Sequence, residues 1–133
     1  MGQKRSSGRS GFAPDISRAR GRYAVNESYI LIASRDPFTS AEVERFYELG
    51  AALRRDGHEV TLFLVQNGVL PARPGARSTR LSRLVQEGVR VLADEFSLRE
   101  RGISNACLAD GVTPAPLDFV IDALAHGAKT LWH

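Results

Sequence analysis

Val-Arg-Val-Leu-Ala-Asp-Glu-Phe-Ser-Leu-Arg-Glu-Arg-Gly, residues 89–102, is the stretch around which the rest of the chain is organised. Its apolar start, Val89–Ala93, predicts a short buried strand. Asp94 and Glu95 then begin a helical turn, and Gly102 is a residue type that commonly follows the end of a helix. Ligands of an open α/β sheet bind beyond the carboxyl ends of its strands. Asp94 therefore falls where a binding or catalytic site is expected.

Two longer apolar runs precede this stretch. Ser28–Ser34 and Val60–Val65 lack regular polar alternation, which suits strands covered on both faces, as in a parallel sheet. Between them, Thr39 with Glu42 forms a capping-box pattern that predicts a helix start, and Gly57 predicts the helix end. A strand, a helix and a strand at this spacing predict a right-handed βαβ unit whose two strands are parallel.

The segment between the second and third strands predicts a turn, a loop and a helix. Residues 66–68, Gln-Asn-Gly, end the second strand in a turn. The first half of residues 71–83 is rich in Pro and Gly and predicts an extended surface loop. Thr79 then starts a short helix that ends at Gly88.

The C-terminal part predicts one more helix and one more strand. Residues 103–111 are expected to be irregular or weakly helical, and Pro114 and Pro116 precede the helix. Ala128–Trp132 is the final short strand. The helix residues expected to face the core recur at a spacing of three or four: Leu117, Val120, Ile121 and Leu124. The alternation of strands and helices predicts an α/β three-layer sandwich with a mostly parallel sheet of four or five strands.

Length and composition are those of a single soluble domain. The chain has 133 residues, 43% of them hydrophobic and 25% charged, which is enough to bury a continuous core. Its net charge of +3 is distributed unevenly. Residues 1–22 carry six basic side chains and one acid, a net charge of +5, whereas the rest carries twelve basic and fourteen acidic side chains, a net charge of −2. The basic pI therefore says little about a ligand of the folded part.

Residues 1–22 are predicted to be a disordered basic arm in front of a domain of residues 23–133. Ser, Gly and Arg dominate the arm, and Phe12 and Ile16 are its sizeable apolar side chains. Such a segment cannot bury enough surface to offset the entropy lost on ordering. Three interpretations stay open: a remnant of cloning, an arm that docks on a neighbouring subunit, or an electrostatic tail for polyanions.

Several classes of site and location are not expected. A single cysteine, Cys107, excludes an intramolecular disulfide and a cysteine-cluster metal site. The three histidines show no metal-ligand spacing, and no phosphate-loop or dinucleotide fingerprint is found, so no metal and no cofactor are predicted. No apolar run approaches the roughly 18–20 residues that cross a bilayer, and no apolar region follows the basic N-terminus. We expect a cytoplasmic protein without a membrane partner.

Four arginines gather in residues 71–83: Arg73, Arg77, Arg80 and Arg83. Such a cluster raises the question of nucleic-acid binding. Aromatic residues are absent from this loop, so stacking on single strands has no support. A solvated or subunit-facing loop is the favoured interpretation, and nucleic acid is not an expected partner.

Three stretches between about Tyr29 and Trp132 follow one another in a characteristic order and spacing. They are Leu53–Val60 at the end of the first helix, the Gly-Val turn of residues 66–69, and a third set made of residues 88–91, Leu98–Gly102, Gly111, Val112 and Leu117. Together they resemble the DsrE family of small sulfur-relay proteins, which includes the TusD and DsrF-like subunits.

The resemblance implies a flavodoxin-like fold, assembly into trimers or hexamers, and sulfur-relay proteins as partners. In active members a cysteine just after the third strand carries a persulfide, and counting back from the Arg-Gly pair aligns that cysteine with Asp94. A carboxylate cannot hold a sulfane sulfur, because that role needs a polarisable thiolate nucleophile. This chain has therefore lost the relay chemistry or performs it at another residue.

Two residues compete for the chemistry. Cys107 is the one possible sulfur carrier and lies thirteen positions beyond Asp94, on a segment able to fold back over the strand ends; the alternative is a small buried hydrophobe. Asp94 is interpreted as a pocket carboxylate that binds a cationic group or acts as a base. It is also interpreted as an N-cap favoured by the helix dipole, and the two roles are compatible.

Arg35, Asp36 and Asn67 leave the first two strands at the same edge of the sheet as Asp94 and are expected to line one crevice with it. Two functions follow. One is a DsrE-like protein of intracellular sulfur relay or trafficking, a non-carrying or atypical member. The other is a non-catalytic module of the same fold that binds a small ligand or a protein. The sequence does not decide whether the chain is an enzyme.

Overall fold

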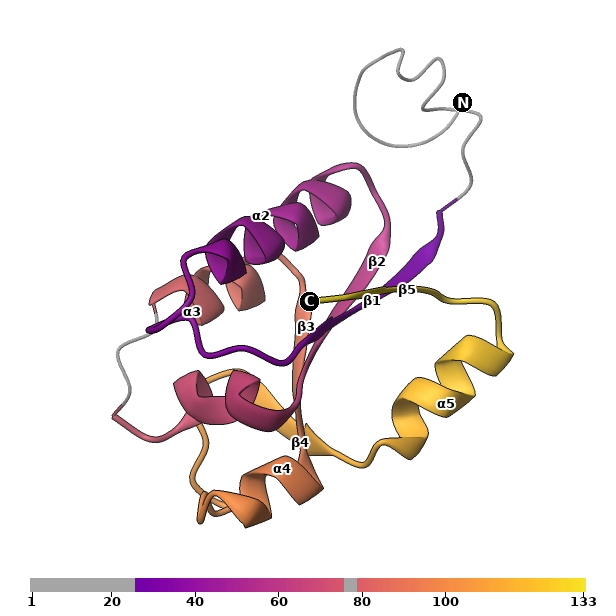
Figure 1. Ribbon diagram of the computed structural model, residues 1–133. Coiled ribbons are helices and arrows are strands. Elements are labelled where there is room, and N and C mark those ends of the chain that lie inside the picture. Colours follow the sequence, from indigo (N-terminus) through magenta and orange to yellow (C-terminus); the bar gives the residue numbers. More distant parts are fainter. Residues whose placement is uncertain (1–25, 76–78) are drawn as a thin grey trace.

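Five parallel strands form the centre of the fold (Figure 1). The structure is a computed structural model that describes residues 26–75 and 79–133, and the predicted basic arm, residues 1–22, lies outside this part of the chain. The strands are β1 (Ser28–Ala33), β2 (Glu59–Leu64), β3 (Arg90–Asp94), β4 (Val112–Ala115) and β5 (Lys129–Trp132). Their order is β4-β3-β2-β1-β5 and every neighbouring pair is parallel, which confirms the predicted sheet.

Helices cover both faces of the sheet. On one face lie α2 (Glu42–Arg55) and α3 (Thr79–Gln86), and on the other lies α5 (Asp118–Ala125) (Figure 1). The 3-10 helix η1 (Gln66–Ala72) follows β2, and α4 (Glu95–Glu100) follows β3 without a break. The three-layer α/β sandwich is confirmed. Its strand order is not the 2-1-3-4-5 of flavodoxin itself, so the likeness to flavodoxin lies in the layers and not in the connectivity.

The two faces of the sheet bury cores of unequal size. The cluster beneath α2 and α3 contains eighteen buried residues of the described chain, whereas the cluster beneath α5 contains seven. Phe63 is fully buried in the smaller cluster, where its ring stacks against Phe119 of α5 with ring centroids 6.4 Å apart. A single helix of eight residues therefore covers its face only in part.

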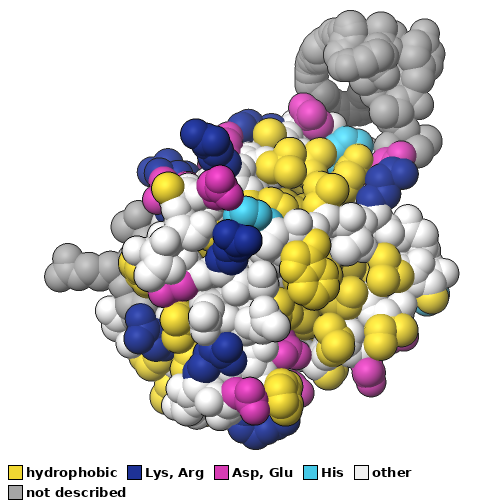
Figure 2. Space-filling model, viewed as in Figure 1, with side chains coloured by type: hydrophobic (Ala, Val, Ile, Leu, Met, Phe, Trp, Pro, Cys, Tyr) yellow, Lys and Arg dark blue, Asp and Glu magenta, His cyan; other side chains and the backbone are white. Residues whose placement is uncertain are grey.

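The predicted core side of the last helix is wrong in three of four positions. Val120 is buried, but Leu117, Ile121 and Leu124 are 53%, 58% and 47% exposed. The side that packs on the sheet contains Phe119, Val120 and Ala123. Apolar residues occur almost all around this helix, so spacing alone cannot select the buried side. Figure 2 shows hydrophobic side chains gathered on the surface around α5.

Strand β4 was not predicted as a separate element, because Pro114 lies in its middle. Proline lacks the N–H that a central strand would donate and is tolerated at the edge of a sheet. β4 pairs with β3 alone and occupies that edge position. The sheet thus reaches five strands, the upper end of the predicted number.

The predicted capping box at the start of α2 is also wrong. The helix begins at Glu42 after Ala41, which makes no side-chain cap. Thr39 instead turns back, and its Oγ1 donates to the carbonyl oxygen of Asp36 at 3.2 Å. The carboxylate of Asp36 accepts from the N–H of Phe38 at 2.9 Å. Short-range bonds of this kind compete with helix capping, and here they form a separate turn before the helix.

The surface loop predicted for the first half of residues 71–83 begins further along the chain than expected. The 3-10 helix η1 continues through Pro71 to Ala72, and both residues are buried. The helix predicted from Thr79 is confirmed as α3.

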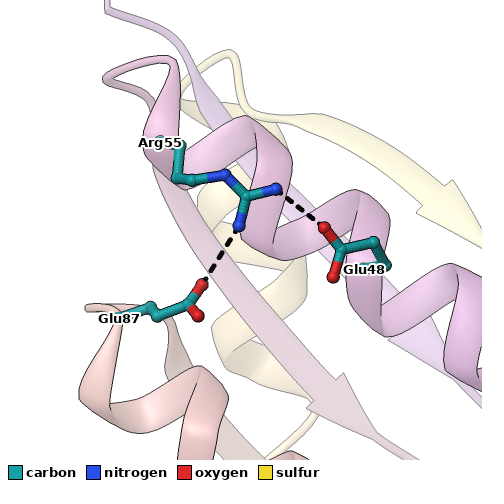
Figure 3. A network of polar contacts seen from close by, with 3 residues as sticks. All are labelled: Glu48, Arg55 and Glu87. Atoms are coloured by element: carbon teal, nitrogen blue, oxygen red, sulfur yellow. Dashed lines mark hydrogen bonds and ion pairs between the residues drawn. The ribbon is translucent and has the colours of Figure 1, made fainter.

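A surface network ties the end of α2 to the turn after α3 (Figure 3). Arg55 donates to Glu48 at 2.7 Å and to Glu87 at 3.4 Å. The hydrogen bond that Arg55 donates to the Glu48 carboxylate raises the pKa of Arg55 above its ordinary value. The side chains are solvated, so the network adds little to stability.

None of the helices within residues 26–75 and 79–133 has both the length and the hydrophobicity needed to span a bilayer.

Candidate functional site

A cleft of about 500 Å³ opens at the carboxyl ends of the strands. Residues at or directly after the ends of β1, β2, β3 and β5 contribute to it, together with η1, α4 and the N-cap residue of α5. It is lined by Ser34, Val65, Gln66, Asn67, Asp94, Phe96, Ser97, Glu100, Arg101, Leu117 and Trp132. This is the edge of a parallel sheet at which ligands bind.

Asp94 ends β3 and is the N-cap of α4. Its Oδ2 accepts hydrogen bonds from the N–H of Ser97 at 2.9 Å and from the Ser97 hydroxyl at 2.7 Å. The side chain is 8% exposed and lines the cleft. The side chain of Asp94 is thus both a helix cap and a carboxylate of the cleft, the two placements that the sequence predicts. No Lys, Arg or His among the described residues forms a salt bridge with it.

Ser97 connects the ends of two neighbouring strands. While its hydroxyl donates to Asp94, its Oγ accepts from the backbone N–H of Gln66 at 2.8 Å. Gln66 has φ of +51°, a left-handed conformation that is uncommon for a residue other than glycine. The turn after β2 is therefore held in an unusual conformation by a hydroxyl that Asp94 orients.

Asn67 and Arg101 form a second link across the cleft wall. Arg101 Nε donates to Asn67 Oδ1 at 3.1 Å, and its Nη1 donates to the carbonyl oxygen of Ser97 at 3.3 Å. The predicted crevice residue Asn67 is thus in the cleft together with Asp94. The charges on the lining are two carboxylates, Asp94 and Glu100, and one guanidinium, Arg101.

Arg35 and Asp36 are not among the residues that line this cleft, in contrast to the expectation. The chain turns away after Ser34, which takes their place. The N–H and hydroxyl of Ser34 donate to the carbonyl oxygen of His133 at 2.9 and 3.0 Å. Asp36 instead lies near Tyr47, whose pKa is raised by burial and then by the charge of Asp36.

Cys107 is exposed and does not line the cleft. It lies in the loop between α4 and β4, where its N–H donates to the carbonyl oxygen of Ser104 at 3.2 Å. Nearby, the N–H of Ala109 donates to the carbonyl oxygen of Ala72 at the end of η1, at 2.9 Å. The loop therefore packs beside η1 and does not bring the thiol to the strand ends.

Several cleft residues were missed by the sequence interpretation. Ser97 follows Asp94 by three positions, the spacing of an N-cap to the N–H it accepts, and this was the available signal. Trp132 has no comparable signal, because it reaches the cleft only where β5 pairs with β1, at the register Ile32 to Trp132.

The cleft is equipped for binding. Its lining offers one oriented carboxylate, amide groups and exposed aromatic rings, and it contains no thiol and no imidazole within the described residues. Ser97 is 4% exposed and its hydroxyl is committed to two hydrogen bonds, so it is not placed as a nucleophile. The described part of the chain contains no group of three or more His, Cys, Asp or Glu arranged to hold a metal ion.

Comparison with protein-family models finds a match over residues 27–132, nearly all of the described chain, to the model of the DsrE/DsrF-like family. No curated protein matches.

Solved structures with the same fold come from bacteria and an archaeon. The chain is similar to the ychN protein of E. coli, with a TM-score of 0.73, 23% identity, and 80% of this chain and 99% of that chain covered. It is similar to MTH1491 of Methanobacterium thermoautotrophicum, a protein of unknown function, with a TM-score of 0.70, 19% identity, and 82% of this chain and 100% of that chain covered. It is also similar to BT1422 of Bacteroides thetaiotaomicron, a conserved protein of unknown function, with a TM-score of 0.66, 16% identity, and 80% of this chain and 95% of that chain covered. These identities support the fold alone.

Proposed function

This chain belongs to the DsrE/DsrF-like family, and on that premise we propose that it is a non-carrying component of intracellular sulfur trafficking. In this role the carboxyl-edge cleft binds a partner or a small ligand, and no sulfur is carried on the chain itself. The proposed location is the cytoplasm, where thiols stay reduced. The proposed partners are sulfur-relay proteins that bear the thiol this cleft lacks.

Asp94 is the observation on which the proposal rests. The resemblance aligns Asp94 with the cysteine that carries the persulfide in active members, and Asp94 ends β3 inside the cleft. A carboxylate has no sulfur to form the S–S bond of a persulfide. Cys107 is exposed in a different loop, outside the set of residues that line the cleft.

A persulfide-transfer experiment tests this role. The protein is incubated with a cysteine desulfurase and L-cysteine, and its intact mass is measured. In the transfer, an acceptor thiolate attacks the outer sulfur of the donor persulfide, forms a new S–S bond and releases the donor as a thiolate. We expect no stable gain of about 32 Da, the mass of one sulfur atom, on the wild-type chain.

The matched variant places a thiol in the cleft and removes the other one. Asp94→Cys combined with Cys107→Ser is expected to gain the sulfur that the wild type does not, because the thiol then stands at the carboxyl end of β3. A stable gain on the wild type that disappears in Cys107→Ser alone contradicts the non-carrying role and makes Cys107 the carrier.

Self-association into a trimer or a hexamer is the proposed assembly. Two neighbouring surfaces support it. Leu117, Ile121 and Leu124 form an exposed apolar side of α5, and β5 is an edge strand whose Trp132 is 67% exposed. Apolar surface of this kind commonly marks an interface, and an open strand edge is usually covered.

Sedimentation velocity measures the assembly directly. The wild type is expected to sediment at three or six times the chain mass of 14.6 kDa. Ile121→Lys places a charge in the apolar surface and is expected to shift the distribution to smaller species. Asp122→Lys, at the adjacent exposed position, is the control and is expected to leave it unchanged. A wild-type monomer at about 100 µM, well above typical obligate-interface affinities, contradicts the proposal.

The second candidate is a non-catalytic module that binds a small ligand or a protein. The size of the cleft favours it, since about 500 Å³ is within the range of ligand pockets. In this case the carboxylate of Asp94 recognises a cationic group on the ligand. The Asp94→Asn variant separates this candidate from a purely structural role for the carboxylate, because it keeps the cap and removes the charge.

A further inference from the structure

A second cavity lies at the opposite edge of the sheet, where the strands begin. Its volume is about 210 Å³. The first residues of β1, β2 and β3 line it, together with the side of α5 that packs on the sheet, Arg54 in the last turn of α2, Gly88 after α3 and Ala128 before β5. We call it the amino-edge pocket. It shares no lining residue with the carboxyl-edge cleft.

Strand alternation and α5 create the apolar part of the amino-edge pocket. Successive side chains of a strand point to opposite faces of the sheet. Leu31 is therefore buried in the cluster beneath α2, and Ile30 is buried in the cluster beneath α5. From α5, Phe119 and Ala123 face the same space. The space stays open because α5 is short and covers this face only in part. The pocket therefore offers an apolar surface next to solvent.

Two arginines complete the pocket, and neither has a carboxylate partner within the described residues. Arg54 Nη1 donates to the carbonyl oxygen of His58 at 3.2 Å, and Arg90 lies over the ring of Phe119 at 5.6 Å. Arg55 and Arg80, by contrast, are held by glutamates. A guanidinium group whose donors are not used by a carboxylate is suited to bind one from a ligand.

Glu59 limits the charge that this pocket accepts. Its carboxylate lines the pocket and accepts from the hydroxyl of Ser28 at 2.9 Å. With Arg54 and Arg90 the charged groups on the lining sum to +1. A ligand with one negative charge balances this lining, whereas a second negative charge would be repelled by Glu59.

We propose that the amino-edge pocket binds a small organic carboxylate, with its anionic group at Arg54 and Arg90 and its apolar body against Phe119 and Ala123. The proposal does not depend on the function of the carboxyl-edge cleft, because the two sites lie at opposite ends of the strands.

Titration of the full-length ¹⁵N-labelled protein with benzoate tests the proposal by NMR at low salt. Benzoate is expected to shift the amides of Thr61, Ala123 and Ala128, which line the pocket. Benzamide has the same shape without the charge and is expected to bind at least about tenfold more weakly, as is usual when a charge-assisted hydrogen bond is lost. Phenyl phosphate is expected to bind more weakly than benzoate, because its second charge meets Glu59.

Four variants test where the anionic group binds. Arg54→Gln and Arg90→Gln are each expected to weaken benzoate binding by roughly fivefold or more, the loss of one charged donor. Arg45→Gln removes an exposed arginine of α2 that does not line the pocket, and it is expected to change binding by less than about twofold. Glu59→Gln is expected to reduce the difference in binding affinity between phenyl phosphate and benzoate, because it removes the negative charge that repels the second charge of the phosphate. Thermal midpoints confirm that each variant is folded.

The proposal would be overturned by no shifts up to about 20 mM benzoate, well beyond weak-ligand affinities. It would also be overturned by benzamide binding as tightly as benzoate, by phenyl phosphate binding more tightly than benzoate, or by unchanged benzoate binding in both arginine variants. Shifts confined to Asn67 and Ser97 would place the ligand in the carboxyl-edge cleft and would equally contradict it.

Discussion

Gly68→Ala is expected to lower the free energy of unfolding by about 3 kcal/mol, the upper part of the range for overpacking a core. A Cβ at Gly68 would overlap the carbonyl group of Ala33 at the end of β1. These are backbone atoms, and the Ala33 oxygen already accepts the N–H of Val65 at 2.9 Å. The neighbour therefore cannot move aside, and η1 must shift away from the sheet.

The same shift would reach the cleft, because η1 begins with two of its lining residues, Gln66 and Asn67. Urea unfolding measures the stability, and the amide spectrum reports the cleft. Gly50→Ala is the matched control: its Cβ meets the flexible side chain of Leu31 at 3.3 Å, and alanine favours the helix. That variant is expected to stay within about 1 kcal/mol of the wild type. Gly68→Ala as stable as Gly50→Ala would contradict the close approach of η1 to β1.

Asp94→Ala is expected to lower the free energy of unfolding by about 2–3 kcal/mol, the loss of a helix cap together with a buried hydroxyl that loses its acceptor. The N–H and the hydroxyl of Ser97 both donate to the Asp94 carboxylate. The hydroxyl also orients the turn at Gln66. Hydrogen exchange at the amides of Gln66 and Ser97 is therefore expected to become faster, while exchange in β1 follows the global change.

Asp94→Asn and Asp118→Ala are the matched variants for Asp94→Ala. Asparagine is as good an N-cap as aspartate, so Asp94→Asn is expected to remain within about 1 kcal/mol of the wild type. Asp118 is an exposed acid in the first turn of α5, and its loss is expected to cost less than about 1 kcal/mol. If Asp94→Ala behaves like Asp118→Ala, the buried network does not hold the cleft. If Asp94→Asn binds every candidate partner and ligand as the wild type does, the charge of Asp94 is not part of recognition.

The fold was largely predictable because short segments of the sequence are enough to identify most of its strands. Ser28–Ala33 and Glu59–Leu64 are mostly apolar and lack regular polar alternation, which suits strands covered on both faces. The glycines after the helices mark their ends by the same local rule, as at Gly57, whose φ is +97°. The errors fell where the local signals conflict: Pro114 inside β4, and the apolar residues on both sides of α5.

The site was predictable in part. Asp94 and Asn67 line the cleft as expected, because each follows the carboxyl end of a strand and parallel strands end at one edge. Arg35 and Asp36 obey the same rule but do not line it. The turn in which Asp36 accepts the N–H of Phe38 directs the chain toward α2. A rule about strand ends places a residue at an edge and does not say where its side chain points.

By itself, the sequence determined the number of layers, the parallel direction of the strands and the presence of a carboxylate, Asp94, at the end of the third strand, since each of these follows from local hydrophobicity or residue identity. Only the tertiary structure decided that β5 lies beside β1 and brings Trp132 to the cleft, that Ser97 joins Asp94 to Gln66, and that Cys107 lies elsewhere. The physical reason is that these contacts join residues far apart in sequence or depend on side-chain direction. Their positions are selected by packing over the whole sheet, which no single segment encodes.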